Sequence, residues 1–400
     1  MNTASGGPLK GLRMIEMGQL LAGPFCGQLM GDFGCEVIKI EQPGTGDPVR
    51  EWGREKANGE SLLWPVIARN KKCITLNARV PEGQAIIQKL AATSDFLLEN
   101  FRPGTLEKWN LGYDVLSKIN PGLIMVRVSG YGQTGPYSYR AGYAAVGEAM
   151  GGLRYVVGDP STPPSRVGIS LGDTTAATNA CMGALMALQN RHVTGKGQVV
   201  DSAIYESVLQ LMESLVTEYD KAGYIRERTG SFLPKIAPSN IYPAKDGQYL
   251  IAANQDTVFK RLAEVMGQPE LAADPRYATH IARGERQKEL DDMIGAWSKT
   301  KTTKELAEML DAAGVPSGLM YRAPEMLADP HFKAREAIIE VWDKHLGAIK
   351  MQSTFPKLSD TPGQVNWTGP DMGEHNDEIY KGLLKMDDAT LKDLRARGII

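Results

Sequence analysis

The sequence lacks the features that mark several large classes of protein. Its 400 residues carry 45 basic and 47 acidic side chains, which gives a formal charge of −2. Without a basic excess there is little electrostatic reason to expect nucleic acid or an anionic membrane as a partner. No apolar run reaches the roughly 20 residues that a transmembrane helix needs. Residues 1–12 also lack the basic-then-apolar pattern of a signal peptide, so we expect a soluble, cytoplasmic protein.

Cysteine and histidine are scarce and show no metal-binding or redox spacing. The four cysteines are scattered without a CxxC pair, at Cys26, Cys35, Cys73 and Cys181. The five histidines occur without an HxxH or HExxH motif. In a chain of this size, such cysteines indicate reduced thiols in a folded core rather than a disulfide framework. We therefore expect neither a bound metal ion nor a disulfide.

The fingerprints of common nucleotide-binding sites are missing as well. The first strand-to-helix turn, residues 18–24, reads GQLLAGP, which is neither G-x-G-x-x-G nor a P-loop. This disfavours NAD and ATP chemistry. Residues 168–172 do match G-x-S-x-G, but the residues upstream read PPSR, where a nucleophile elbow needs an apolar strand. A serine hydrolase is therefore disfavoured too.

The sequence does contain a regular alternation of strand-like and helix-like segments. Strands are expected at residues 12–17, 37–41, 73–76, 95–100, 123–128 and 199–203. Helices are expected at residues 23–33, 82–93, 174–189 and 204–222. Strands that alternate with helices favour a parallel sheet with helices on its faces. The expected fold class is therefore α/β, with a doubly wound, Rossmann-like large domain.

The composition of the sequence changes near residue 224, where charged residues of both signs alternate with Gly, Pro and Ser. A strand-like segment and three helical segments follow, and the last of these helices opens with a capping box, Thr302-x-x-Glu305. We therefore expect a smaller α/β domain at residues 224–327. The large domain is expected to combine residues 1–223 with residues 328–400.

Asp173 stands at the head of the expected helix 174–189, and two interpretations of it remain open. Aspartate is among the commonest N-cap residues, because its carboxylate accepts hydrogen bonds from the first backbone N–H groups. The same position also keeps a carboxylate ionised at the positive end of the helix dipole. An ionised carboxylate in a dry pocket can attack an acyl carbon and form a covalent intermediate. Asp173 is thus a candidate nucleophile.

Several motifs, in order along nearly the whole chain, resemble those of family III CoA-transferases. They lie at residues 9–13, 21–24, 34–41, 99–108, 129–136, 172–173, 194–198, 312–316 and 373–375. The most specific are ENFRPGTLEK at 99–108 and SGYGQTGP at 129–136. This family includes the formyl-CoA, carnitine and bile-acid CoA-transferases. The resemblance implies an enzyme that moves CoA from a donor acyl-CoA to a carboxylic acid.

The resemblance also implies roles for individual residues. Asp173 matches the family's nucleophilic aspartate, which forms an acyl anhydride and then a CoA thioester. The residues that match the family's CoA contacts are Ala22, Arg79, Asn100, Phe101, Arg102, Lys108 and Arg140. Coenzyme A is then a substrate, and no permanent cofactor is needed. Members of the family form interlocked homodimers, so we expect the same of this chain.

Differences from individual members of the family restrict the reactions and substrates that we expect. Leu21 and Ala144 stand where formyl-CoA transferase has glutamine and glutamate, which disfavours formate and oxalate as substrates. The related acyl-CoA racemases carry Gly-His-Asp where this chain has Gly-Tyr-Ala at 142–144, so α-proton exchange is disfavoured. A racemase of the same fold and a catalytically inactive CoA-binding protein remain the alternatives.

The segment IAPSN at residues 236–240 is similar to that of dicarboxylate-using members of the family. We therefore expect succinyl-CoA as the donor and a small dicarboxylic acid as the acceptor. The acceptor carboxylate needs a cationic or amide partner, which Arg50 or Arg166 could supply. The sequence leaves the choice between these two arginines open.

Overall fold

The computed structural model describes residues 6–53 and 55–400, which divide into two compact units. The large unit comprises the described residues up to Leu153, together with Val167–Thr217 and His331–Ile400. The small unit comprises Arg154–Arg166 and Glu218–Pro330. It therefore takes in a segment that the sequence-based limits assign to the large domain. Those limits, 1–223 with 328–400 and 224–327, stay predictions.

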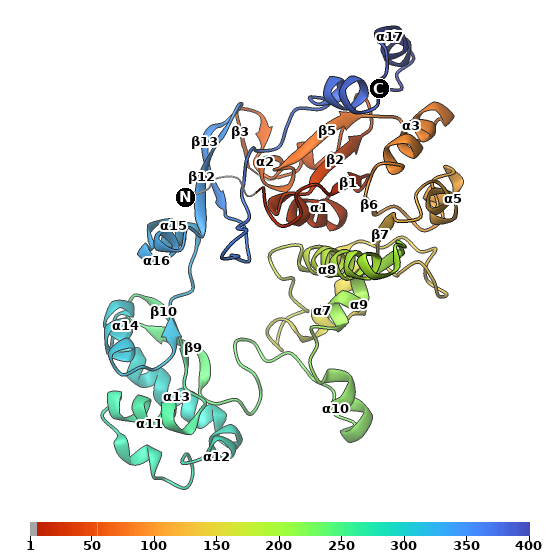
Figure 1. Cartoon of the computed structure of the whole chain (residues 1–400). Coiled ribbons are helices and arrows are strands. Elements are labelled where there is room, and N and C mark those ends of the chain that lie inside the picture. The colour runs from red at the N-terminus through yellow and green to blue at the C-terminus, as the bar shows by residue number, and fades with distance from the viewer. Residues whose placement is uncertain (1–5, 54) are drawn as a thin grey trace. The chain divides into compact units, whose positions relative to one another are not determined.

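The large unit is built on a six-stranded parallel sheet (Figure 1). Its strands are β1 (Arg13–Glu16), β2 (Glu36–Glu41), β5 (Lys71–Thr75), β6 (Phe96–Glu99), β7 (Ile124–Ser129) and β8 (Val199–Ala203). Their order across the sheet is β5-β2-β1-β6-β7-β8. The chain thus builds outward from β1 in one direction and then returns to continue from β6 in the other. This is the doubly wound order, and the predicted α/β fold class is confirmed.

Helices cover this sheet, and their apolar residues close its core. The core beneath α3 (Pro81–Ala91), α5 (Tyr113–Ile119) and α17 (Asp388–Ala396) includes Ile15 and Ile38 from the strands. Every residue of β7 is buried, as expected for a central parallel strand covered on both faces. Helices α1 (Ala22–Asp32) and α8 (Leu171–Thr194) pack against each other, as Figure 1 shows.

Helix α8 begins three residues earlier than predicted and extends past the predicted end at residue 189. Ser170 is its N-cap residue, so Asp173 lies within the first turn and the N-cap interpretation of Asp173 is wrong. The predicted start is late because residues 168–172 are rich in Gly and Ser, which weakens the helical pattern there. The buried side of α8 is lined by small residues that let neighbouring elements approach closely, namely Ala176, Ala177, Ala180, Ala184 and Ala187.

The helix predicted over residues 204–222 is broken in the structure. Its residues form α9 (Ile204–Leu209) and α10 (Leu215–Ala222). Between them, Glu213 adopts a positive φ of 51°, which a continuing right-handed helix excludes. The apolar pattern continues through the break because both helices are amphipathic. The residues of α10 are nonetheless exposed or half-buried. The pattern alone therefore does not reveal the break.

The small unit contains a three-stranded antiparallel sheet in the order β11-β10-β9. Its strands are β9 (Ser239–Ala244), β10 (Gly247–Ala252) and β11 (Ser317–Gly318). Its helices include α11 (Asp256–Val265), α12 (His280–Glu285), α13 (Gln287–Ser298), α14 (Thr303–Ala312) and α15 (Ala323–Ala328). The predicted capping box at the start of α14 is confirmed, because Thr302 and Glu305 cap each other's backbone N–H groups.

Shorter elements complete the chain. In the large unit they are η1 (Pro48–Glu51), β3 (Lys56–Ala57), β4 (Glu60–Ser61), α2 (Trp64–Ile67), α4 (Thr105–Lys108), α6 (Ala144–Met150), β12 (Ile338–Asp343), β13 (Gly347–Gln352) and the π-helix η3 (Glu378–Leu383). The small unit also contains η2 (Pro269–Ala272), and α7 (Leu153–Val156) and α16 (Pro330–Ala334) fall at the limits of the units. Within the described residues, no helix has both the length and the apolar character needed to cross a membrane.

Candidate active site

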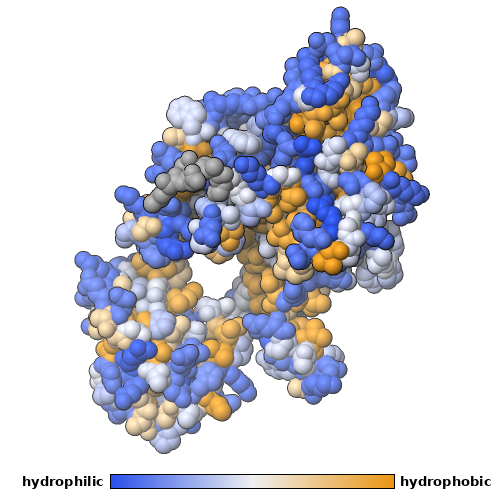
Figure 2. Space-filling view, viewed as in Figure 1, coloured by the Kyte–Doolittle hydropathy of each residue, from blue (hydrophilic) through white to orange (hydrophobic). Residues whose placement is uncertain are grey.

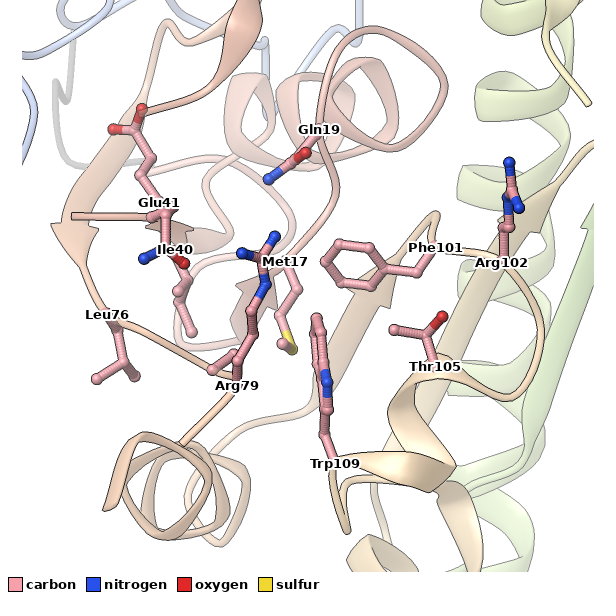
Figure 3. A pocket seen from close by; sticks show the side chains of 12 residues that line it. Met17, Gln19, Ile40, Glu41, Leu76, Arg79, Phe101, Arg102, Thr105 and Trp109 are labelled. Carbon is pink, nitrogen blue, oxygen red and sulfur yellow. The ribbon is translucent and has the colours of Figure 1, made fainter. Parts of the chain in front are cut away.

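A pocket of about 320 Å³ lies at the carboxyl ends of four strands of the parallel sheet (Figure 3). Its lining residues follow or end β1, β2, β5 and β6: Met17, Gln19, Ile40, Glu41, Gln42, Leu76, Ala78, Arg79, Phe101, Arg102, Thr105 and Trp109. In doubly wound sheets, ligands bind outside the carboxyl ends of the strands at the point where the strand order reverses. Here that point lies between β1 and β6. The topology therefore makes this pocket the candidate ligand site.

The pocket combines aromatic rings with guanidinium groups. Phe101 and Trp109 meet edge to face, with ring centroids 5.2 Å apart. Figure 3 shows Arg79 extending into the pocket opposite these rings, while the side chain of Arg102 stands apart on the far side of Phe101. A flat apolar face beside arginine suits a ligand that carries an aromatic base and phosphate groups. CoA is such a ligand.

Asn100 stands between two of these strand ends and binds backbone. Its Oδ1 accepts a hydrogen bond from the N–H of Gln19 at 2.8 Å, and its Nδ2 donates to the carbonyl oxygen of Gln19, also at 2.8 Å. A Cβ atom built on Gly18 or Gly23 would lie 3.3 Å from this amide, so both positions favour glycine. Asn100 therefore holds Gln19 at the pocket, and its predicted contact with CoA stays a prediction.

A buried carboxylate fixes the neighbouring Phe101. Glu99 is 1% exposed, and its Oε2 accepts a hydrogen bond from the N–H of Phe101 at 2.7 Å. Its Oε1 accepts from Nε of Arg127 at 2.7 Å, and Arg127 also pairs with Glu107. Burial raises the pKa of Glu99 to about 7, although Arg127 opposes this shift. The start of the segment that carries Phe101 and Arg102 is thus anchored in the core.

The pKa of Glu99 predicts a pH-dependent stability. Between about pH 4.5 and 7, native Glu99 keeps its proton while the unfolded chain releases it, so the free energy of unfolding falls as pH rises. The loss attributable to Glu99 is at most about 3 kcal/mol. Glu99→Gln keeps an acceptor for the N–H of Phe101 and should remove this loss. Urea unfolding at pH 5 and pH 8 measures it, and identical pH dependence in both proteins would contradict the assignment.

Asp173 lies half-buried in the first turn of α8, where the helix dipole favours an ionised carboxylate. The preceding Gly172 is buried, and its N–H donates to Oε1 of Glu148 at 3.2 Å. A Cβ on Gly172 would lie 3.1 Å from the side chains of Glu148 and Ile204. Glycine at this position therefore lets α6 and α9 pack tightly around the head of α8, which fixes the turn that carries Asp173.

The structure brings together three of the predicted CoA contacts, Arg79, Phe101 and Arg102, in one pocket. Ala22 is buried at the first residue of α1, directly after the loop that carries Gln19. The described lining of the pocket does not include Asp173, Lys108 or Arg140. Lys108 is exposed at the end of α4, and the guanidinium of Arg140 lies 3.7 Å from the ring centre of Tyr137.

The arginines considered for the acceptor acid have different surroundings. Nε and Nη2 of Arg50 donate to the carboxylate of Glu41 at 2.8 and 2.7 Å. Nη2 also donates to the carbonyl oxygen of Pro370, and the guanidinium stacks on Trp64 at 3.8 Å. These partners disfavour Arg50 as a carboxylate receptor. Arg166 is exposed and belongs to the small unit.

Sequence reasoning missed several residues that line the pocket, among them Met17, Gln19 and Trp109. The first two follow β1, and a signal for them was available. The predicted strand at residues 12–17 is the first of a doubly wound sheet, and the residues just past its carboxyl end are expected at a ligand site. Trp109 carries no comparable signal, because a tryptophan after a short helix is equally typical of a core.

Comparisons with known proteins show the family of the chain. The sequence pattern of "CoA-transferase family III" matches residues 9–376. Over 98% of both chains, the protein is 59% identical to the succinyl-CoA–D-citramalate CoA-transferase of Chloroflexus aurantiacus. It is 41% identical to the beta subunit of the succinyl-CoA–L-malate CoA-transferase of the same organism, also over 98% of both chains. The human succinyl-CoA:glutarate CoA-transferase is 32% identical over 98% of this chain and 90% of its own.

A solved structure shows the same fold. The crystal structure of a CaiB/BaiF family protein from Brucella suis superposes with a TM-score of 0.83 at 32% identity. The match covers 94% of this chain and 99% of that one. The predicted resemblance is therefore confirmed over the length of the chain, by motif order, by fold and by full-length relatives. The chain belongs to family III of the CoA-transferases.

Proposed function

We propose that this CoA-transferase moves CoA from succinyl-CoA to a small dicarboxylic acid, by way of the carboxylate of Asp173. The observation that carries the proposal is the 59% identity, over 98% of both chains, with a succinyl-CoA–D-citramalate CoA-transferase. Relatives at 41% and 32% identity are named for transfer from succinyl-CoA to malate and to glutarate. All three named acceptors are short dicarboxylates. A four- or five-carbon dicarboxylic acid is thus the expected acceptor class.

The proposed reaction proceeds by acyl exchange at Asp173. A carboxylate oxygen attacks the thioester carbon, CoA thiolate leaves, and a succinyl-aspartyl anhydride forms. The thiolate then attacks the aspartyl carbonyl, which releases succinate and leaves CoA as an aspartyl thioester. The acceptor carboxylate attacks this thioester and expels the thiolate, which finally takes the acceptor acyl group and frees Asp173. The helix dipole of α8 supports the ionised state that the first attack requires.

The pocket at the strand ends is the proposed CoA site. Its arginines, Arg79 and Arg102, can pair with the phosphates of CoA, and Phe101 offers a ring face to the base or the pantetheine arm. The roles of Asn100, Ala22, Lys108 and Arg140 as CoA contacts are proposed from the family resemblance. Asp173 is proposed to receive the thioester at the other end of the CoA molecule.

A homodimer belongs to the same proposal. Large apolar side chains are exposed on α8 and α10 of this chain: Met182, Leu185, Met186, Val193, Val216 and Tyr219. Figure 2 shows apolar groups interrupting the polar surface of the large unit on the face in view. Exposed apolar groups in such number favour a protein partner, and the family resemblance points to a second copy. Light scattering should give twice the mass of the chain.

The experiment that tests the transfer is a screen of acceptor acids. The enzyme is incubated with succinyl-CoA and one acid at a time, and new CoA thioesters are followed by mass spectrometry. Citramalate, malate and glutarate are the central members, with formate, oxalate and carnitine as controls. Transfer to at least one short dicarboxylate and none to the controls is expected. CoA binding without transfer to any acid would instead support a catalytically inactive CoA-binding protein.

A further inference from the structure

Buried side chains hold the loop between β1 and α1 at successive backbone positions. This loop, residues 17–21, carries Met17 and Gln19 into the pocket. Gly18 O accepts from Nζ of Lys39 at 2.9 Å, Gln19 pairs with the half-buried Asn100, and the N–H of Leu20 donates to Oδ1 of Asp47 at 3.1 Å. Just past the loop, in α1, the carbonyl oxygen of Pro24 accepts from Nζ of Lys71 at 2.6 Å. Lys39, Asp47 and Lys71 are at most 2% exposed. Side chains of this burial are rigid supports.

Leu20 is the strained member of the loop. Its φ is +65°, a left-handed conformation that is uncommon for a residue other than glycine, asparagine or aspartate. Its side chain packs against a buried apolar cluster that includes Val49 and Trp64. Packing thus favours leucine at this position, while the backbone favours glycine. A conformation of this kind persists only where the surrounding structure enforces it.

Asp47 holds Leu20 in this conformation. Its Oδ1 accepts hydrogen bonds from the N–H groups of Leu20 and Val49, at 3.1 and 3.0 Å. Its Oδ2 pairs with Nζ of Lys39 at 2.8 Å. Burial would raise the pKa of Asp47, but Lys39 and the two backbone donors hold it below its usual value, so the carboxylate is ionised. Its own N–H donates to Oε1 of Glu41, which lines the pocket.

We infer that Asp47 is a positioning residue of the pocket, which holds Leu20 in the left-handed conformation and thereby sets Gln19 against the bound CoA. Figure 3 shows Gln19 at the pocket, between Met17 and the start of α1. A relaxed Leu20 would turn the preceding peptide and move Gln19. The inference rests on the proposed function, because it takes this pocket to be the CoA site. Its mechanical part, the control of Leu20 by Asp47, is independent of the ligand.

Two substitutions at Asp47 separate the charge of its carboxylate from its hydrogen bonds. Asp47→Asn keeps an oxygen for the N–H of Leu20, whereas Asp47→Ala removes it. We expect Asp47→Ala to speed amide hydrogen exchange at residues 18–21. It should also weaken CoA binding about tenfold by calorimetry, because Gln19 would leave its place against the bound CoA. Asp47→Asn should stay within about threefold of the original affinity. Equal affinity of Asp47→Ala and the original protein would overturn the inference.

A matched control and a rescue variant exclude a general loss of stability. Asp32 is another buried carboxylate of the large unit, paired with Arg69 at the far end of α1, outside the pocket. Asp32→Ala should lower the melting temperature but leave CoA affinity unchanged. Leu20→Gly takes the left-handed conformation without strain, so it should restore affinity when added to Asp47→Ala. Equal loss of affinity in Asp32→Ala, or no rescue by Leu20→Gly, contradicts the inference.

The proposed function fails in a different way. If the original protein binds no CoA, the pocket is not the CoA site, whatever the variants show. If it binds CoA and Asp47→Ala binds it equally well, the proposed function stands and the role of Asp47 is refuted.

Discussion

Asp173→Asn is expected to abolish CoA transfer, with a loss of about a thousandfold or more in turnover, as found when enzymes lose a covalent nucleophile. The amide is neutral and cannot attack a thioester. Fold and CoA binding should persist, because asparagine has the same size and the loss of a charge at a helix N-terminus costs only about 0.3–1 kcal/mol. Steady-state assays with succinyl-CoA, together with calorimetry of CoA binding, separate the two effects.

Asp114→Asn is the matched control for this prediction. Asp114 also lies in the first turn of a helix, α5, but far in sequence from the head of α8. Its variant should lose a similar small stability and keep full activity. Trapping the covalent intermediate identifies the nucleophile directly. Hydroxylamine added with succinyl-CoA should leave a hydroxamate on the peptide that contains Asp173. Full activity of Asp173→Asn, or a hydroxamate on another peptide, would assign the nucleophile elsewhere.

The second large effect is expected at Arg79. Its side chain extends into the pocket, and pairing with a phosphate of CoA would contribute about 1.5–3 kcal/mol. Arg79→Ala should therefore raise the dissociation constant of CoA by about ten- to a hundredfold and raise KM more than it lowers kcat. Arg79→Lys should recover part of the affinity, since it keeps the charge without the planar fork.

Lys89→Ala provides the control for charge. Lys89 is exposed in the last turn of α3, outside the pocket, and its removal changes the net charge by the same amount. It should leave CoA affinity nearly unchanged. Because the Arg79 effect is electrostatic, it should also shrink as salt is added. A pocket that binds something other than CoA would show no difference between these two variants.

The strands of the large unit were predictable because each contains a short apolar stretch, longest in the fully buried strands β6 and β7. The strand at residues 199–203 matches β8 at both ends, and the one at 37–41 differs from β2 by a single residue. The fold class followed from their alternation with helices. The place of Arg154–Arg166 in the small unit did not follow from the sequence, because contacts between segments distant in sequence leave no local pattern.

Helix ends were predicted less well than helix positions. The start of α8 was obscured by Gly168 and Gly172, which disfavour a helix by propensity, although Gly172 serves close packing here. The break before α10 occurs at Glu213, whose left-handed backbone is not one that its side-chain type favours. At the head of α8, packing against α6 and α9 outweighs the local preference of the sequence.

The candidate site was predicted in part, and only through the family resemblance. Arg79, Phe101 and Arg102 gather in one pocket as expected. Asn100 has a structural role that motif matching could not predict, because a motif records residue identity and not hydrogen-bond partners. Gln19 is held by Asn100, 81 positions along the chain, so its place after the first strand was the only sign of it in the sequence.

The alanines of α8 have a consequence for how the enzyme tolerates change. Helix α1 starts beside the pocket and α8 starts at the turn of Asp173. The two helices pack against each other, and most of the buried side chains of α8 are single methyl groups. The buried alanines leave little room, since a methyl group cannot swing aside to absorb an added group. A bulkier residue at one of these alanines would thus displace the start of α8, where the proposed nucleophile lies, far from where it was introduced.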